Sequence, residues 1–504
     1  MEVVVALKSL RLLPAVALAA ALVCSAAGPA APLDAGRGPA DPVYPALGNA
    51  GYDVQWYDLA FTYRADTRRV DATATVTALT LRRLPRFELD AAGLDVRAVR
   101  VQGTPAAFRA HGEKLEVVPA RPVAPGTPMA VTVDYTADPH AAGPHTGWVP
   151  TEDGFAVAGQ PDAAHTVFPC NDRPSDKAGF TVSVTAPDAL FGVANGSLAA
   201  TVSQGGLTRR TYVSRDPMAS ELLQVSVGDY TVVRRTGPGG LPLRDVVPTR
   251  RAAATEPALA LTAGQLDWLE QRLGPFPLET YGLMPADTDD PAAFDFTGLE
   301  TQTLTVYKPA FLLQPEQKIG AHMMHELVHS WFGNSVTPTT WADLWLNEGH
   351  ADFYGLLYRY DRGWPDSGGL TTLDARMKET YRHGDQWRHD SGPVAAPTAA
   401  NLYDTQRYLG GALVLYALRQ EVGEQVFDRI EREYLRRYRG ADAGTRDFVA
   451  TASRVAGRDL GPFLDAWLYG DRTPPMPGHP DWATGPATGR QRAFAAVPRG
   501  SGTL

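Results

Sequence analysis

The sequence predicts an α+β protein of more than one domain, in which a β domain comes first and a mainly helical domain follows. Three observations predict this. Between residues 52 and 233, short runs alternate apolar and polar residues and end at Gly, Pro or Asp. From residue 255 onward, the apolar residues recur at helical spacing. The chain has 504 residues, which is enough for two or three domains that each bury a core.

The first 28 residues have the pattern of a secretory signal. Lys8 and Arg11 precede an apolar run at residues 12–23, and small residues follow at 25–28. The apolar run is short and is interrupted by Pro14, so it is poorly suited to cross a bilayer as a permanent anchor. We therefore expect a secreted protein with no stable membrane insertion after the signal is cleaved.

The N-terminal segment also leaves an alternative open. An uncleaved signal, or lipidation of Cys24, would anchor the protein to a membrane instead. Residues 29–48 are rich in Pro, Ala and Gly and are expected to form a linker. Signal cleavage would leave Cys170 as the remaining cysteine, so no intramolecular disulfide is expected.

A β domain is expected at residues 49–247. Its apolar and polar residues alternate in short runs, which is typical of antiparallel sheets with one buried face. The expected strands lie at residues 53–63, 70–76, 115–118, 129–135, 180–185 and 221–227.

A mainly helical domain is expected at residues 248–475. Its apolar residues take helical spacing from Thr255 up to a turn at residues 274–277. After Pro474 the chain is rich in Pro and Gly, and residues 476–504 are expected to form a tail outside the domains. The expected helices beyond the turn lie at residues 316–332, 341–360, 408–421, 425–439, 445–456 and 460–469.

The helical half contains the segment His325-Glu326-Leu-Val-His329. Four residues are slightly more than one helical turn, so both imidazoles would project from one helix face toward a single metal ion. A catalytic zinc takes three protein ligands and keeps one position for water. Glu348, after eighteen intervening residues, is the candidate third ligand. The sequence therefore predicts one zinc ion per chain, bound by His325, His329 and Glu348.

Three neighbours of the ligands have different expected roles. Glu326 projects off the ligand row, which suits a general base that takes a proton from the attacking water. Asp352, four residues after Glu348, would lie on the same helix face, where it could accept a hydrogen bond from a ligand histidine. His322 is expected to be an ordinary packed or solvated histidine, because its spacing places no third ligand at the open position.

The segments around the motif resemble the zinc signature of the aminopeptidase N family of gluzincin metallopeptidases. The signature covers residues 325–336 and 341–349. Residues 168–177 resemble a block late in the family's N-terminal domain, and residues 274–282 resemble its entry into the catalytic domain. The resemblance implies a saddle-like β-sheet domain followed by a thermolysin-like catalytic domain. It points to the short two-domain bacterial type, which lacks the large C-terminal helical domain of many relatives.

The resemblance also implies substrate-binding residues before the metal helix. The family's Gly-x-Met-Glu-Asn segment corresponds to residues 297–301, which makes Gly298 and Glu300 the candidates here. A partly buried Glu300 carboxylate would hold the free α-amine of a substrate and restrict cleavage to the first peptide bond. Three of the five positions depart from the family's pattern, while the glutamate is kept.

Two further candidates follow from the same resemblance. Residues 407–412 resemble the segment that carries the family's catalytic tyrosine, so Tyr408 is the candidate that stabilises the oxyanion, with Tyr403 as the alternative. Gln160 falls where the family places a polar residue that lines the amine pocket.

The resemblance implies a zinc aminopeptidase that acts on peptides with a free N-terminus. The alternatives are a zinc endopeptidase, an epoxide hydrolase of related fold, and a non-catalytic peptide-binding module. The formal net charge of -9 disfavours nucleic acid as a partner. The sequence specifies neither the oligomeric state nor the preferred N-terminal residue.

Overall fold

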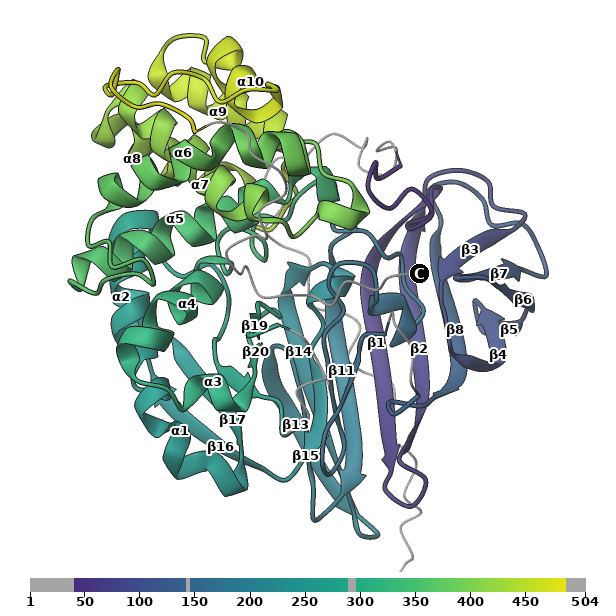
Figure 1. Cartoon of the computed structure of the whole chain (residues 1–504). Coiled ribbons are helices and arrows are strands. Elements are labelled where there is room, and N and C mark those ends of the chain that lie inside the picture. The colour runs from purple at the N-terminus through teal and green to yellow at the C-terminus, as the bar shows by residue number, and fades with distance from the viewer. Residues whose placement is uncertain (1–39, 142–145, 289–295, 486–504) are drawn as a thin grey trace, which may run out of the picture.

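The computed structural model describes residues 40–141, 146–288 and 296–485. The predicted signal at 1–28, most of the predicted linker and residues 486–504 of the predicted tail lie outside these described residues. Figure 1 shows a strand-rich N-terminal half, coloured purple to teal, beside a helical half, coloured green to yellow. The predicted fold class, a β domain followed by a mainly helical domain, is therefore confirmed.

The largest sheet of the N-terminal half has eight strands. They are β1 (Tyr52–Arg64), β2 (Arg69–Thr80), β4 (Asp95–Val101), β5 (Thr104–Pro105), β8 (Pro128–Ala137), β11 (Ala178–Pro187), β13 (Ser197–Gln204) and β14 (Leu207–Met218). Their spatial order is β13-β14-β11-β1-β2-β8-β4-β5. Side chains of β2 alternate between buried and partly buried positions, as the sequence pattern predicts for a sheet with one core face.

One strand pair departs from the antiparallel expectation, because β1 and β11 run parallel from Trp56 and Gly179 to Thr62 and Thr185. Alternation of apolar residues reports which face of a strand is buried but not its direction. A parallel neighbour needs a long connection, and more than a hundred residues separate β1 from β11. The sheet is therefore mixed at this one position.

Two smaller sheets complete the N-terminal half. One contains β9 (Trp148–Pro150), β10 (Phe155–Val157), β12 (Phe191–Ala194) and β15 (Val225–Gly228), and the other contains β3 (Phe87–Asp90), β6 (Ala107–His111) and β7 (Lys114–Val118). The strand expected at 221–227 is wrong in its first part, where the 3₁₀ turn η2 (Ser220–Leu222) lies instead. The carbonyl of Leu222 accepts a hydrogen bond from the Gln302 N–H at 3.0 Å, so a long-range contact decides this local structure.

The second half begins with short strands and then becomes helical. The strands are β16 (Tyr230–Thr236), β17 (Pro242–Pro248), β18 (Leu283–Pro285), β19 (Gly298–Leu299) and β20 (Thr305–Tyr307). The helices are α1 (Ala252–Leu259), α2 (Leu261–Leu273), α3 (Pro309–Leu312), α4 (Glu316–Val328), α5 (Trp345–Asp361), α6 (Leu373–Ser391), α7 (Thr405–Val422), α8 (Glu424–Tyr438), α9 (Thr445–Ala456) and α10 (Gly461–Tyr469). None of these helices combines the length and apolar character that a membrane span requires.

Two of the predicted helices depart most from their expected limits, and α7 begins three residues earlier than expected, at Thr405. The metal helix was expected to reach Phe332, but α4 ends at Val328 and His329 is its C-cap. The helix expected at 341–360 is divided into the 3₁₀ turn η5 (Trp341–Asp343) and α5. The side chains of Thr340 and Asp343 form a capping box that begins η5, and Leu344 lies between this turn and α5. Helix α6 was not predicted.

The described ends of the chain pack against the helical half. Asp41, in the predicted linker, accepts a hydrogen bond from the Trp341 N–H at 2.7 Å. Val43 joins a buried apolar cluster that includes Trp341. In the predicted tail, the Trp482 ring stacks on Tyr416 with centroids 5.9 Å apart and 4° between the planes. Residues 40–48 and 476–485 are therefore ordered parts of the fold.

Candidate active site

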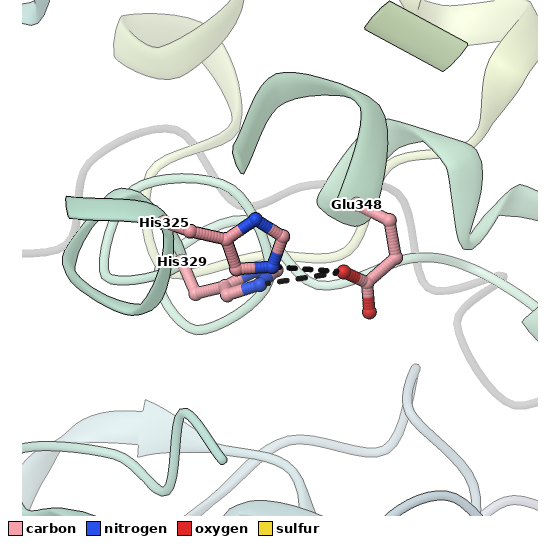
Figure 2. A group of neighbouring side chains, drawn as sticks. All are labelled: His325, His329 and Glu348. Atoms are coloured by element: carbon pink, nitrogen blue, oxygen red, sulfur yellow. Dashed lines mark ion pairs between the residues drawn. The ribbon is translucent and has the colours of Figure 1, made fainter. Parts of the chain in front are cut away.

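Three buried side chains converge between helices α4 and α5. His325 Nε2 lies 3.3 Å from Glu348 Oε2, and His329 Nε2 lies 3.6 Å from the same oxygen. Figure 2 shows the two imidazoles and the carboxylate pointing toward one another. All three residues are less than a tenth exposed. The structure therefore brings together the three metal ligands that the sequence predicts.

Close packing of glycines helps to hold the helices in this arrangement. Gly349 follows Glu348 on α5, and a Cβ placed on it would lie 2.9 Å from the main chain of Gly411 on α7. A larger residue at either position would push the two helices apart. Because α7 also carries Tyr408, this contact places the tyrosine helix against the helix of the third ligand.

The three side chains fit a zinc ion. Two ligand atoms about 2.0–2.1 Å from a tetrahedral zinc lie about 3.3 Å from each other, which is close to the distances observed here. The second ring nitrogen of each histidine is also occupied. His325 Nδ1 lies 2.9 Å from Asp352 Oδ1, and His329 Nδ1 lies 3.1 Å from the carbonyl oxygen of Phe332. These contacts orient both Nε2 atoms toward Glu348. The prediction of zinc is confirmed, and the contact proposed for Asp352 is present.

The charges of the ligand group are strongly coupled. Burial opposes the positive charge of His329, but the carboxylates of Glu300 and Glu348 outweigh it and raise its pKa to about 9. Burial would raise the pKa of Glu348, but hydrogen bonds from His325 and His329 lower it to about 2. The carboxylate is thus ionised, and positive charge at the centre stabilises it. A zinc dication would supply that charge in place of the imidazole protons.

Glu326 lies beside the ligands in a narrow space. Burial raises the pKa of Glu326 to about 8, and the nearby Glu300 carboxylate adds to this shift while His325 opposes it. A metal dication bound at the ligands would lower this pKa. A Cβ on Gly298 would lie 2.7 Å from Glu326 Oε1, so a side chain at position 298 would displace this carboxylate. His322 Nε2 lies 3.2 Å from the same oxygen. Gly298 and His322 therefore confine the carboxylate group.

Glu300 forms the acidic wall of the site. It is 4% exposed, and its Oε1 lies 4.0 Å from His329 Nδ1. The side-chain amide of Gln160 donates a hydrogen bond of 2.6 Å to the same oxygen. Gln160 comes from the N-terminal half, 140 residues away in sequence, so both halves of the protein contribute to this wall.

The position of Tyr408 distinguishes it from Tyr403. The Tyr408 ring lies parallel to His325, with centroids 6.0 Å apart and 11° between the planes. Tyr403 instead packs against the apolar cluster of Val43, Trp341, Leu344 and Leu402. Tyr408 is therefore the tyrosine beside the metal ligands.

Sequence reasoning missed three contacts at this site. His322 is expected from the sequence to be an ordinary packed or solvated histidine, although its spacing of four to Glu326 indicates a contact along the helix. The side-chain amide of Asn334 donates to the Glu300 carbonyl at 2.8 Å, a contact that the sequence does not indicate. Lys177 belongs to a block noted for its resemblance, and its ammonium donates to the carbonyls of Asn334 and Ser335. The last two contacts join distant segments and have no local signal in the sequence.

The protein has a β domain followed by a helical domain, and two histidines of an H-E-x-x-H motif meet a glutamate of the next long helix. This ligand set defines the gluzincin class of zinc metallopeptidases. The family follows from comparisons with known proteins. The model of the peptidase family M1 domain matches residues 258–467, and that of the peptidase M1 N-terminal domain matches residues 54–222. The chain belongs to peptidase family M1, which confirms the resemblance seen in the sequence.

Similar proteins with known structures have the same layout. The M1 zinc metallopeptidase from Deinococcus radiodurans matches with a TM-score of 0.75 and 28% identity, over 88% of this chain and 99% of that chain. A mutant of that protein bound to a Tyr-Ser-Ala substrate matches with the same TM-score and identity. Glutamyl aminopeptidases from Sus scrofa and Homo sapiens are each 27% identical, over 61% and 63% of this chain. The chain spans about a third of the length of these curated relatives, 34% in both cases.

Proposed function

We propose that the protein is a secreted, zinc-dependent aminopeptidase that removes the N-terminal residue of peptides. One observation carries the proposal. The Glu300 carboxylate is buried within 4.0 Å of a zinc ligand and is held by Gln160, in a position to receive an ammonium group. A charged partner is needed to offset the cost of burying this carboxylate, and the α-amine of a peptide supplies one.

The reacting groups can be assigned to the remaining residues. Zinc, when bound, lowers the pKa of a water molecule and polarises a carbonyl group. Glu326 takes a proton from the attacking water and returns it to the leaving amine, a role that suits a buried carboxylate beside the ligands. The Tyr408 hydroxyl donates to the oxyanion that develops on the substrate carbonyl.

Glu300 and Gln160 determine which peptide bond reaches these groups. An α-amine bound at Glu300 fixes the first carbonyl next to the metal ligands, since Glu300 lies beside His329. An internal segment of a peptide has no ammonium group to offer there. An internal peptide bond would therefore leave the buried carboxylate with Gln160 but without a cationic partner, which disfavours endopeptidase action.

The test compares a free-amine substrate with its N-acetylated form. The zinc-loaded protein should hydrolyse an aminoacyl-coumarin and leave the N-acetyl derivative intact. Glu300→Gln should raise KM by about 10- to 100-fold, because a charge-assisted contact is replaced by a neutral one. Equal rates on both substrates would refute the proposal and indicate an endopeptidase.

Glu326→Gln tests the general base and also serves as a control for folding. This variant should bind zinc with wild-type stoichiometry and lose about 10²- to 10⁴-fold in kcat. Undiminished turnover would remove Glu326 from the mechanism. A wild-type protein that binds zinc and free-amine peptides without hydrolysing them would instead be a binding module.

Export is part of the proposal and depends on the basic and apolar pattern of residues 8–23. N-terminal sequencing of the protein from the medium and from the cell fraction tests it. A mature N-terminus close to residue 29 is the expected result. An intact N-terminus in the membrane fraction would support the anchored alternative.

A further inference from the structure

We propose that Asn334 and Lys177 are positioning residues that hold Glu300 in its amine-binding place, so that the N-terminal half supports amine recognition from two sides. The inference rests on the proposed function, because it concerns the same amine site. The two residues act through Glu300 and make no contact with the reacting atoms.

Asn334 connects the end of the metal helix to Glu300. Its main-chain N–H donates to the His329 carbonyl at 2.9 Å, and its side-chain amide donates to the Glu300 carbonyl at 2.8 Å. The side chain is 2% exposed, so water does not replace this bond easily if it is lost. The main chain of Glu300 is therefore fixed relative to a zinc ligand by one residue.

The rest of the Asn334 side chain indicates that its donor is the important group. Its Oδ1 is buried and has no hydrogen-bond partner within the described residues. A buried amide oxygen without a partner is costly, and an apolar residue of similar size would avoid that cost. The Nδ2 contact with Glu300 is the compensating interaction that the structure shows.

Lys177 supports Asn334 from the N-terminal half. It immediately precedes β11, and its ammonium donates to the carbonyls of Asn334 and Ser335 at 2.8 and 2.7 Å. Lys177 is partly buried, and this burial lowers its pKa to about 7, while the nearby Asp442 carboxylate opposes the shift. Two carbonyls held by one ammonium fix the turn that presents the Asn334 side chain.

Glu300 is thus held at both ends. Gln160 bonds to its carboxylate and Asn334 bonds to its main-chain carbonyl. Gln160 and Lys177 both belong to the N-terminal half, whereas Glu300 and Asn334 belong to the second half. A small shift of Glu300 would move its carboxylate away from the bound amine and weaken that charge-assisted contact, which lowers the affinity for free-amine substrates.

The first experiment measures kinetics and zinc content of the full-length, zinc-loaded protein. Asn334→Ala and Lys177→Met should raise KM for an aminoacyl-coumarin by about 10-fold, and kcat should change much less. Zinc stoichiometry should stay at one per chain. A fall in kcat without a change in KM would overturn the inference, because it would indicate a general structural effect.

The second experiment measures binding rather than turnover. An amino-acid hydroxamate and its counterpart without the amine share the same metal-binding group and differ only at the position facing Glu300. Wild-type protein should prefer the amine form, and the variants should lose about 10-fold of that preference. An equal loss for both inhibitors, or an unchanged preference, would overturn the inference.

A double-mutant cycle separates positioning from an independent role. If Asn334 acts through Glu300, then Asn334→Ala should have no further effect on amine preference in a Glu300→Ala background. Additive losses would overturn the inference. Asn334→Asp keeps the shape and removes the donor, so it serves if the alanine variant does not fold.

Matched lysine variants complete the design. Lys177→Arg keeps a cation at this partly buried position and should retain most of the amine preference. Lys318→Met removes an exposed lysine from α4 and should behave as wild type. A wild-type protein that does not prefer the amine inhibitor would contradict the proposed function itself. Variants that keep a wild-type preference would contradict only the positioning role.

Discussion

Removal of the Asp352 carboxylate should weaken zinc binding without removing a ligand. Asp352 Oδ1 lies 2.9 Å from His325 Nδ1, and the Asp352 side chain is 23% exposed. Loss of such an outer partner typically lowers metal affinity by about 10- to 100-fold, or about 1.4–2.7 kcal/mol. Because water can reach this partly exposed contact, we expect Asp352→Ala to fall near the lower end of that range.

Asp352→Asn divides the effect into geometry and charge. An asparagine oxygen can still accept the Nδ1–H bond, so the ring orientation is kept and only the negative charge is lost. Hydrogen bonds to charged groups contribute about twice as much as neutral ones. The asparagine variant should therefore lose about half of the free energy that the alanine variant loses.

Competition with a fluorescent zinc chelator at constant pH measures both variants. The pH must be constant because zinc displaces protons from the histidines when it binds. Asp361→Asn is the matched control, since Asp361 lies on the same helix and pairs with Arg272 at 2.8 Å. Wild-type zinc affinity in Asp352→Ala, or a larger loss in the asparagine variant than in the alanine variant, would refute this reasoning.

Two other predictions concern Tyr408 and the pH dependence of stability. Tyr408→Phe should lower kcat by about 10²- to 10³-fold in steady-state kinetics, because the hydroxyl that stabilises the oxyanion is lost. Zinc affinity, measured with the same chelator, should change little. An unchanged kcat would favour Tyr403 as the residue that stabilises the oxyanion. Burial, followed by the neighbouring Asp216, raises the pKa of Glu279 from 4.5 to about 7. Between these values the folded protein keeps a proton that the unfolded chain releases, so this contribution to stability is lost as the pH rises through about 7. Glu279→Gln should therefore lose less stability than wild type between about pH 5 and pH 8, as measured by urea unfolding; an equal loss would contradict the assignment.

The parts of the site that the sequence predicts well are those set by local geometry. His325 and His329 share a helix face because they are four residues apart, and this holds although α4 ends one residue before His329. The helix limit was wrong because the chain after His329 is held by a contact from Asn334 and a turn at Gly333, where φ is +129°. Apolar spacing alone does not report such contacts.

The contacts around Glu300 show what the sequence does not predict. Gln160 and Lys177 lie 140 and 157 residues from their partners, and nothing in the local pattern indicates those pairings. Resemblance to a family indicated Gln160, but it assigned no role to Lys177. The β domain was predicted from alternation, which reports its core and not the residues that its loops direct toward the second half.

The distribution of these residues separates two tasks. The metal ligands and Glu326 lie on α4, at its C-cap His329 and on α5, so the chemistry of the attacking water depends on the packing of two neighbouring helices. The amine site depends on the contact between the halves, since Gln160 reaches Glu300 from the N-terminal half. A change that loosens this contact should therefore reduce the preference for free amino termini before it reduces zinc binding. Under the proposed function, amine recognition is a property of the assembled protein, whereas the metal ligands all come from the helical half.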